Sequence, residues 1–235
     1  MPTAVVTHNS GPGGELGHLG TWLSTRGFDV ELVDRDRPFT ADVADDADLL
    51  VMLGSKWSVA RPMDRADDDA HAAAAIATEI ELARRRVAQD RPTLGICFGG
   101  QLLSRALGGQ VRHLDRMFME WETPRSAVAE VGREWFFVHE DHIALPVDAL
   151  ALAEADHATV AFRQGRAWGL QFHPEVDARI LDLWFDDLGM DRAQVDRHID
   201  RLRAREEANR AEAHALFDLI WSRVACAPRE HAAAL

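Results

Sequence analysis

The sequence predicts an α/β fold in which a mostly parallel sheet is covered by helices on both sides. In the first half of the chain, short apolar runs alternate with longer amphipathic stretches, which is the pattern of βαβ units. These runs are predicted to be strands buried on both faces, at residues 3–8, 29–33, 49–53 and 93–96. Helices are predicted between them, at residues 15–26 and around 65–89. Because ligands bind beyond the carboxyl ends of such strands, a site is expected in the loops after Leu53 and Ile96.

The second half of the chain has a different pattern. Its apolar runs are short and are punctuated by Gly or Pro, which predicts strands of a mixed or antiparallel extension at residues 127–131, 135–138, 159–162 and 167–172. Further on, residues 191–224 show a long helical pattern that accommodates one break. No repeat or low-complexity linker divides the sequence. We therefore predict a single domain over residues 1–235, with a C-terminal helical segment at about 190–226.

Composition and charge exclude several classes of partner. The net charge of −13 argues against nucleic acid or an anionic membrane as the main partner, since both require clustered Lys and Arg. No apolar run approaches the roughly 18–20 residues of a membrane span, and the first residues lack the pattern of a secretory signal. There are two cysteines, Cys97 and Cys226. The thiols are predicted to be reduced and the compartment to be the cytoplasm.

The most informative stretch surrounds Cys97. An apolar strand runs into Gly95-Ile96-Cys97-Phe98-Gly99 and continues directly into a helical pattern, which is the strand–turn–helix context of G-x-S-x-G with Cys in place of Ser. A cysteine at a helix N-terminus has its thiolate stabilised by unpaired backbone N–H groups, and the N–H of Phe98 is predicted to face the oxyanion of a tetrahedral intermediate. A buried core cysteine in a Gly-rich turn is the alternative, but G-x-C-x-G arises by chance in only about 1% of chains of this size. We therefore interpret Cys97 as a nucleophile.

A thiolate that attacks an amide needs an acid for the departing amine, usually His. The chain has 11 histidines, and the distinctive one follows a predicted strand in Gln171-Phe172-His173-Pro174-Glu175. In an extended chain residues i and i+2 face the same side, so Glu175 can orient one ring nitrogen of His173 while the other faces Cys97. On its own H-x-E is a weak signal, and its weight comes from the cysteine turn found in the same chain.

The two motifs GICFGGQ and QFHPE, in which His173 lies 76 positions after Cys97, together resemble those of class I glutamine amidotransferases. The stand-alone branch, similar to the glutaminase domain of GMP synthetase, fits best. The resemblance implies a flavodoxin-like three-layer sandwich with a mostly parallel central sheet and a small antiparallel extension. It also implies a triad of Cys97, His173 and Glu175 and no cofactor or metal.

The same resemblance implies further site residues. In the loop after the third predicted strand, Gly54 is expected at the substrate and the N–H of Ser55 is expected to be the second oxyanion donor beside Phe98. Gln101 is expected to contact bound glutamine. The ammonia released would pass to a separate synthetase subunit.

The sequence also departs from the family pattern. Lys56 stands where the family usually has Pro, and Gly100 where it usually has His. The segment at residues 118–122 does not preserve both the Glu and the Gly of the Glu–x–Gly–Trp-like stretch that holds the amino-acid end of glutamine. The sequence therefore leaves open whether the substrate is glutamine or another γ-glutamyl compound.

Several alternatives stay open. Within the same chemistry, the chain could be a γ-glutamyl peptidase. Two other hypotheses are a thiol esterase that uses Cys97, Asp141 and His173, and a regulatory subunit without turnover.

Three further motifs carry little weight. The histidines and acids at residues 138–142 admit a metal site, which we do not favour. The Gly-rich stretch at residues 9–14 lacks G-x-G-x-x-G spacing and is predicted to be a flexible βα turn, and the acidic run at residues 67–69 is predicted to begin a helix.

Overall fold

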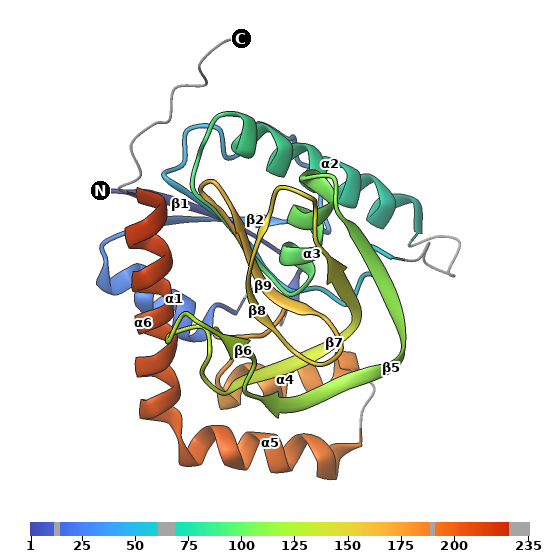
Figure 1. Ribbon diagram of the computed structural model, residues 1–235, viewed down its shortest axis with the longest axis vertical. Helices are drawn as coiled ribbons and strands as arrows, with labels where there is room; N and C mark the ends of the chain where they lie inside the picture. Colours follow the sequence, from blue (N-terminus) through green and yellow to red (C-terminus); the bar gives the residue numbers. More distant parts are fainter. Residues whose placement is uncertain (12–14, 61–68, 189–190, 226–235) are drawn as a thin grey trace.

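A ten-stranded sheet runs through the computed structural model, which describes residues 1–11, 15–60, 69–188 and 191–225 (Figure 1). Its parallel part has the strand order β2-β1-β3-β4-β10, the order of the flavodoxin-like sheet. The strands of this part are β1 (Thr3–His8), β2 (Asp29–Asp34), β3 (Leu49–Met52), β4 (Thr93–Ile96) and β10 (Ala167–Leu170). The α/β class and the flavodoxin-like architecture predicted from the sequence are confirmed.

The antiparallel part continues the sheet beyond β10. Strand β9 pairs with β10 and with β7, and β7 pairs along most of its length with β5. The strands here are β5 (Gln110–Glu122), β6 (Arg125–Ser126), β7 (Trp135–Ala144), β8 (Leu150–Glu154) and β9 (Thr159–Gln164). This part brings β7 beside the carboxyl end of the parallel strands.

Helices cover both faces of the sheet (Figure 1). They are α1 (Gly17–Thr25), α2 (Asp69–Ala88), α3 (Phe98–Ala106), α4 (Ala178–Leu188), α5 (Arg192–Ala204) and α6 (Glu206–Ala225). Strand β1 shows why both faces are filled: Ala4 and Val6 join the core under α1 and α6, whereas Val5 joins the core under α2 and α3. Such strands are buried on both faces, as their apolar runs predict.

A third core cluster joins α4 and α5 to β7. Phe136 and Val138 on β7 pack with apolar residues of both helices, among them Ile180 and Ile199. The predicted C-terminal helical pattern does contain one break, since α5 and α6 are separated at Arg205, where the chain changes direction (Figure 1).

Two local predictions were wrong. The run at residues 29–33 was expected to be buried on both faces, but β2 lies at the edge of the sheet and most of its residues are exposed or half-buried. The run at residues 127–131 was expected to be a strand, but it forms a turn, with the N–H groups of Val131 and Gly132 donating to Val128 O. Its valines still pack against the core, three residues apart. The acidic run at residues 67–69 falls mostly outside the described residues.

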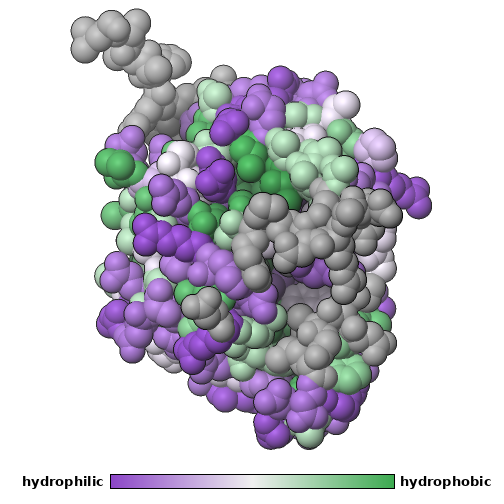
Figure 2. All heavy atoms as spheres, turned by 90° about the vertical axis from the view of Figure 1, so that its right-hand side faces the viewer, coloured by the Kyte–Doolittle hydropathy of each residue, from purple (hydrophilic) through white to green (hydrophobic). Residues whose placement is uncertain are grey.

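The surface agrees with the charged composition. Hydrophilic side chains are widespread on the face shown in Figure 2, and hydrophobic residues are densest in its upper half. Among the helices that the structure describes, none has both the length and the apolar character needed to cross a membrane.

Candidate active site

Cys97 occupies a strained turn between β4 and α3. Its backbone has φ 52° and ψ −108°, a region that non-glycine residues rarely adopt. The flanking glycines make the turn possible. A Cβ on Gly95 would lie 2.3 Å from Gly99 O, and a Cβ on Gly99 would lie 1.9 Å from Met52 O. The strained turn therefore places Cys97 at the carboxyl end of β4, as a nucleophile elbow does.

The close approach of Gly99 on α3 to Met52 on β3 leads to a prediction about stability. Gly99→Ala is expected to destabilise the fold by about 3 kcal/mol or more, because the backbone of Met52 cannot move aside as a flexible side chain could. Gly27→Ala is a matched control: its φ is 71° but no atom lies within 4 Å of the added Cβ, so only about 1 kcal/mol of backbone strain is expected. Urea unfolding of both variants measures the difference. Equal midpoints would show that the contact at Gly99 is not tight.

Cys97 is 6% exposed, and two groups lie against its sulfur. The thiol lies 3.5 Å from Val138 O, and Gln171 Nε2 donates to the sulfur at 3.6 Å. The Cys97 N–H donates to Leu170 O at 2.7 Å, which ties the turn to β10. The position of Val138 on β7 explains how the antiparallel part of the sheet contributes to the site.

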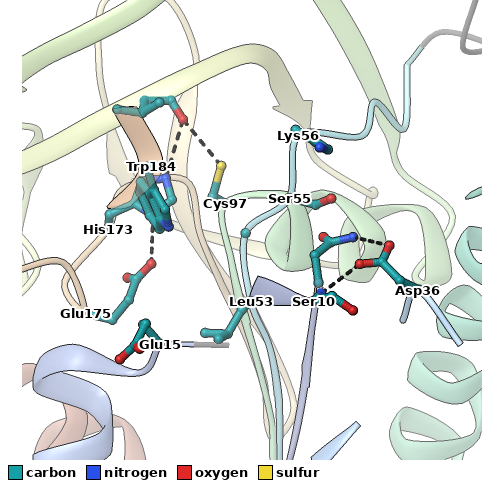
Figure 3. A pocket seen from close by; sticks show the side chains of 13 residues that line it. Ser10, Glu15, Asp36, Leu53, Ser55, Lys56, Cys97, His173, Glu175 and Trp184 are labelled. Carbon is teal, nitrogen blue, oxygen red and sulfur yellow. Dashed lines mark hydrogen bonds and ion pairs between the residues drawn. The ribbon is translucent and has the colours of Figure 1, made fainter. Parts of the chain in front are cut away.

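His173 and Glu175 lie together beyond the end of β10. His173 Nδ1 is 2.7 Å from Glu175 Oε1, and Nε2 is 3.4 Å from Val138 O, the carbonyl that also faces the Cys97 sulfur (Figure 3). Both ring nitrogens therefore face acceptor oxygens, an environment that suits the doubly protonated imidazolium. The ring of Trp184 on α4 packs edge-on against His173, with 5.2 Å between the ring centroids.

The charges around His173 favour its protonated form. Burial lowers the pKa of His173, but the carboxylate of Glu175 and the sulfur of Cys97 raise it more, and the net result is a pKa well above 6.5. A proton on the imidazole and a negative charge on the sulfur stabilise each other in this arrangement. The site can therefore hold an ion pair of thiolate and imidazolium.

These groups line one pocket at the carboxyl ends of β1, β3 and β4. Cys97, His173 and Glu175 form one wall with Val138 and Trp184, and the loop after β3 forms another with Leu53, Gly54, Ser55 and Lys56. The pocket continues to polar residues after β1 and β2, namely Asn9, Ser10, Glu15 and Asp36 (Figure 3).

No group of three or more His, Cys, Asp or Glu side chains within the described part of the chain is arranged to hold a metal ion.

Comparison with known proteins identifies the family. The model of the class-I glutamine amidotransferase family matches residues 21–183 of this chain. The chain belongs to this family. Among curated relatives, GMP synthase [glutamine-hydrolyzing] of Thermus thermophilus is 32% identical over 135 residues, covering 51% of this chain and 27% of that protein. The enzyme of the same name from Pyrobaculum aerophilum is 28% identical over 151 residues, covering 50% and 27%. This chain thus matches about a quarter of the length of those relatives.

Solved structures share the fold. A glutamine amidotransferase from Thermotoga maritima superposes with a TM-score of 0.73 at 19% identity, covering 93% of this chain and 97% of that one. A second, from Methylobacillus flagellatus, gives 0.69 at 23% identity, covering 95% and 94%. Likeness at such low identity concerns the architecture alone.

The residues expected at the site from the amidotransferase resemblance are not all in the pocket. Gly54 and Ser55 line it, and a Cβ on Gly54 would lie 3.2 Å from His173 Cε1 and 3.8 Å from Cys97 Cβ. Phe98 follows Cys97 as the first residue of α3 and its side chain is buried. Gln101 is not part of the pocket wall: it is 3% exposed, and its Nε2 donates to Asp141 O at 3.1 Å and to Gln171 Oε1 at 3.4 Å.

Asp141 is not oriented for the thiol esterase alternative. Its Oδ1 lies 2.9 Å from His113 Nδ1, and its Oδ2 accepts a hydrogen bond from Ser58 at 2.5 Å. The carboxylate that contacts His173 is that of Glu175.

Two residues whose side chains contact Cys97 or His173 were not singled out from the sequence. Gln171 contacts the Cys97 sulfur, and it could have been found because it lies two residues before His173 in the same motif. Trp184 contacts His173 from α4, and no local pattern connects it with the site.

Proposed function

We propose that this chain hydrolyses the γ-amide of glutamine or of a related γ-glutamyl compound through a thioester on Cys97. The observation that carries the proposal is the strained placement of Cys97 in one pocket with the His173–Glu175 pair. Membership of the class-I glutamine amidotransferase family supports the same chemistry. The reducing environment that a thiolate nucleophile needs favours the cytoplasm.

In the proposed reaction the Cys97 thiolate attacks the γ-carbonyl carbon and its electron pair forms the C–S bond. The carbonyl oxygen becomes an oxyanion, which the N–H groups of Phe98 and Ser55 stabilise. His173 donates its proton to the nitrogen, and ammonia leaves as the oxyanion collapses to the thioester. His173 then takes a proton from water, the resulting hydroxide attacks the thioester, and glutamate and the thiolate are released. Glu175 orients the imidazole and stabilises its charged form.

Ammonia would then react at a synthetase active site that lies outside these 235 residues. The GMP synthases that this chain resembles are described as glutamine-hydrolysing, and the matching segment is about a quarter of each. We infer a similar division, in which this chain supplies ammonia to an acceptor enzyme.

A γ-glutamyl peptidase is the second candidate, and the polar extension of the pocket is compatible with it. Beyond Ser55 the cavity extends to Asn9, Ser10 and Asp36, where Asp36 accepts hydrogen bonds from the Asn9 side chain and the Ser10 N–H. These polar residues could bind an amino-acid or peptide leaving group, or the charged amino-acid end that glutamine shares with every γ-glutamyl compound. A comparison of substrates is therefore needed to separate the two candidates.

The deciding measurement is glutamate release from L-glutamine and from γ-glutamyl dipeptides by the purified protein. The glutaminase proposal predicts a higher kcat/KM for glutamine, and the peptidase proposal predicts release from the dipeptides alone. The hydrolytic proposal is wrong if the protein releases glutamate from neither glutamine nor the dipeptides, both alone and with candidate synthetases added. The chain would then be a regulatory subunit without turnover.

A further inference from the structure

Arg35 is a fully buried arginine directly behind the pocket. It follows the last residue of β2 and is 0% exposed. Its guanidinium donates to two successive carbonyls of the loop after β3: Nη1 to Gly54 O at 3.0 Å and Nη2 to Leu53 O at 3.2 Å. It also donates to Thr7 O at 3.1 Å at the end of β1. One side chain thus ties the pocket loop to the neighbouring strand.

The guanidinium is held in place by a buried acid. Glu79 on α2 is also 0% exposed, and its Oε1 lies 3.2 Å from Arg35 Nη2 and accepts a hydrogen bond from the Thr7 hydroxyl. Burial lowers the pKa of Arg35, and the charge of Glu79 offsets part of this effect. A buried ion pair is a weak source of stability because desolvation cancels much of the attraction. Such a pair does fix the position of the groups that it contacts.

Peptide geometry connects Arg35 with the Ser55 N–H. The C=O of Gly54 and the N–H of Ser55 belong to one planar trans peptide and point in opposite directions. Because Arg35 holds the Gly54 carbonyl, the Ser55 N–H points away from Arg35. The Leu53 carbonyl is held in the same way, so the N–H of Gly54 also points away. Two successive N–H groups facing one side form an anion-binding concavity, and both residues line the pocket beside Cys97.

Arg35 also contacts the residue that carries the other proposed oxyanion donor. Its Cζ lies 5.0 Å from the ring centroid of Phe98, within the range of a cation–π interaction. The same guanidinium therefore touches both Phe98 and the peptide that bears the Ser55 N–H.

We propose that Arg35 is a positioning residue that keeps the oxyanion hole assembled, by holding the Gly54–Ser55 peptide in one orientation relative to Phe98. The inference rests on the proposed hydrolysis, since an oxyanion hole has a role only if Cys97 attacks a carbonyl. Without Arg35 the Gly54–Ser55 peptide is free to flip. The carbonyl would then face the developing negative charge where an N–H had been.

Two variants test this role. Arg35→Lys keeps a buried positive charge opposite Glu79 but cannot donate to both carbonyls in the fixed geometry of a guanidinium. Arg35→Met combined with Glu79→Gln removes both charges, so that no unpaired ion is left buried. The double variant is expected to lose about 100-fold in kcat with little change in KM, because the oxyanion exists only after attack has begun. The kcat of Arg35→Lys is expected to lie between that of the double variant and that of the wild type.

Two controls separate positioning from a general loss of structure. Arg86 is also 0% exposed and donates to the carbonyls of Ala44, Ala47 and Pro92, at the opposite, amino-terminal edge of the sheet. Arg86→Lys removes a comparable buried contact and is expected to keep kcat within about twofold even if its Tm falls. Alkylation of Cys97 by iodoacetamide proceeds by direct displacement without an oxyanion, so its rate is expected to be the same in the wild type and in every variant.

The inference is overturned if folded Arg35 variants keep the wild-type kcat, or if Arg86→Lys loses as much kcat as the Arg35 variants do. It is also overturned if iodoacetamide reactivity falls in step with kcat, because the thiol itself would then be altered. If the wild type hydrolyses no γ-glutamyl compound, the proposed function fails separately. The crystal structure of the double variant then decides: a flipped Gly54–Ser55 peptide supports the positioning role and an unchanged one removes it.

Discussion

Cys97→Ala is expected to lower kcat for γ-glutamyl amide hydrolysis by about 10⁴-fold or more, because no thioester can form without the nucleophile. Steady-state glutamate release at saturating substrate measures the loss, with Cys97→Ser as a second variant whose hydroxyl is a far weaker nucleophile at neutral pH. A kcat within tenfold of wild type in the alanine variant would remove Cys97 from the mechanism.

Stability provides the control for this prediction. Alanine at position 97 keeps the backbone at φ 52° and removes only the thiol, so its folding stability is expected to remain within about 1 kcal/mol of wild type. Cys97→Gly removes the side chain but relieves the strain, which is typically about 1–3 kcal/mol at such positions. If urea unfolding shows the glycine variant to be at least as stable as wild type, the backbone at position 97 is strained in the wild type. The strain is then the cost of placing a cysteine side chain at this turn.

The parts of the site that rest on local geometry could be predicted from the sequence. Gly95 is required by its contact with Gly99 inside the same strand–turn–helix unit, so the G-x-C-x-G spacing indicated the turn at Cys97. Likewise, His173 and Glu175 are two residues apart, and extended backbone is sufficient to bring them together. The contact that requires Gly99 is with Met52 on β3, and this contact is not visible in the local sequence.

The parts that depend on distant segments could not be predicted in this way. Arg35 reaches the loop after β3 because β2, β1 and β3 are neighbours in the sheet, and nothing near position 35 in the sequence indicates what it contacts. The edge position of β2 is likewise a property of the whole sheet. Gln101 was expected at the substrate, but packing against β7 and the Gln171 side chain places it outside the pocket wall.

Glu175→Gln is expected to lower kcat by about 10³- to 10⁴-fold, as loss of the orienting carboxylate does in related triads. The amide has nearly the shape of the carboxylate, so the side chain can still reach His173 Nδ1, but the charge is lost. Asp141→Asn is the matched control: it also changes a buried acid that faces a histidine, His113, and it lies on β7 close to the site. The thiol esterase alternative makes the opposite prediction, in which Asp141→Asn abolishes turnover and Glu175→Gln leaves it intact.

The pH profile adds a test that a structural effect would not reproduce. The carboxylate of Glu175 raises the pKa of His173, and Glu175→Gln removes that contribution while burial, which lowers the pKa, remains. The imidazolium is the form that protonates the leaving group, and it exists only below the pKa of His173, so kcat falls as the pH rises through that value. The alkaline limb of the kcat profile is therefore expected to move to lower pH in Glu175→Gln and to stay in place in Asp141→Asn. An alkaline limb that does not move in Glu175→Gln would mean that Glu175 holds the imidazole in position without setting its charge.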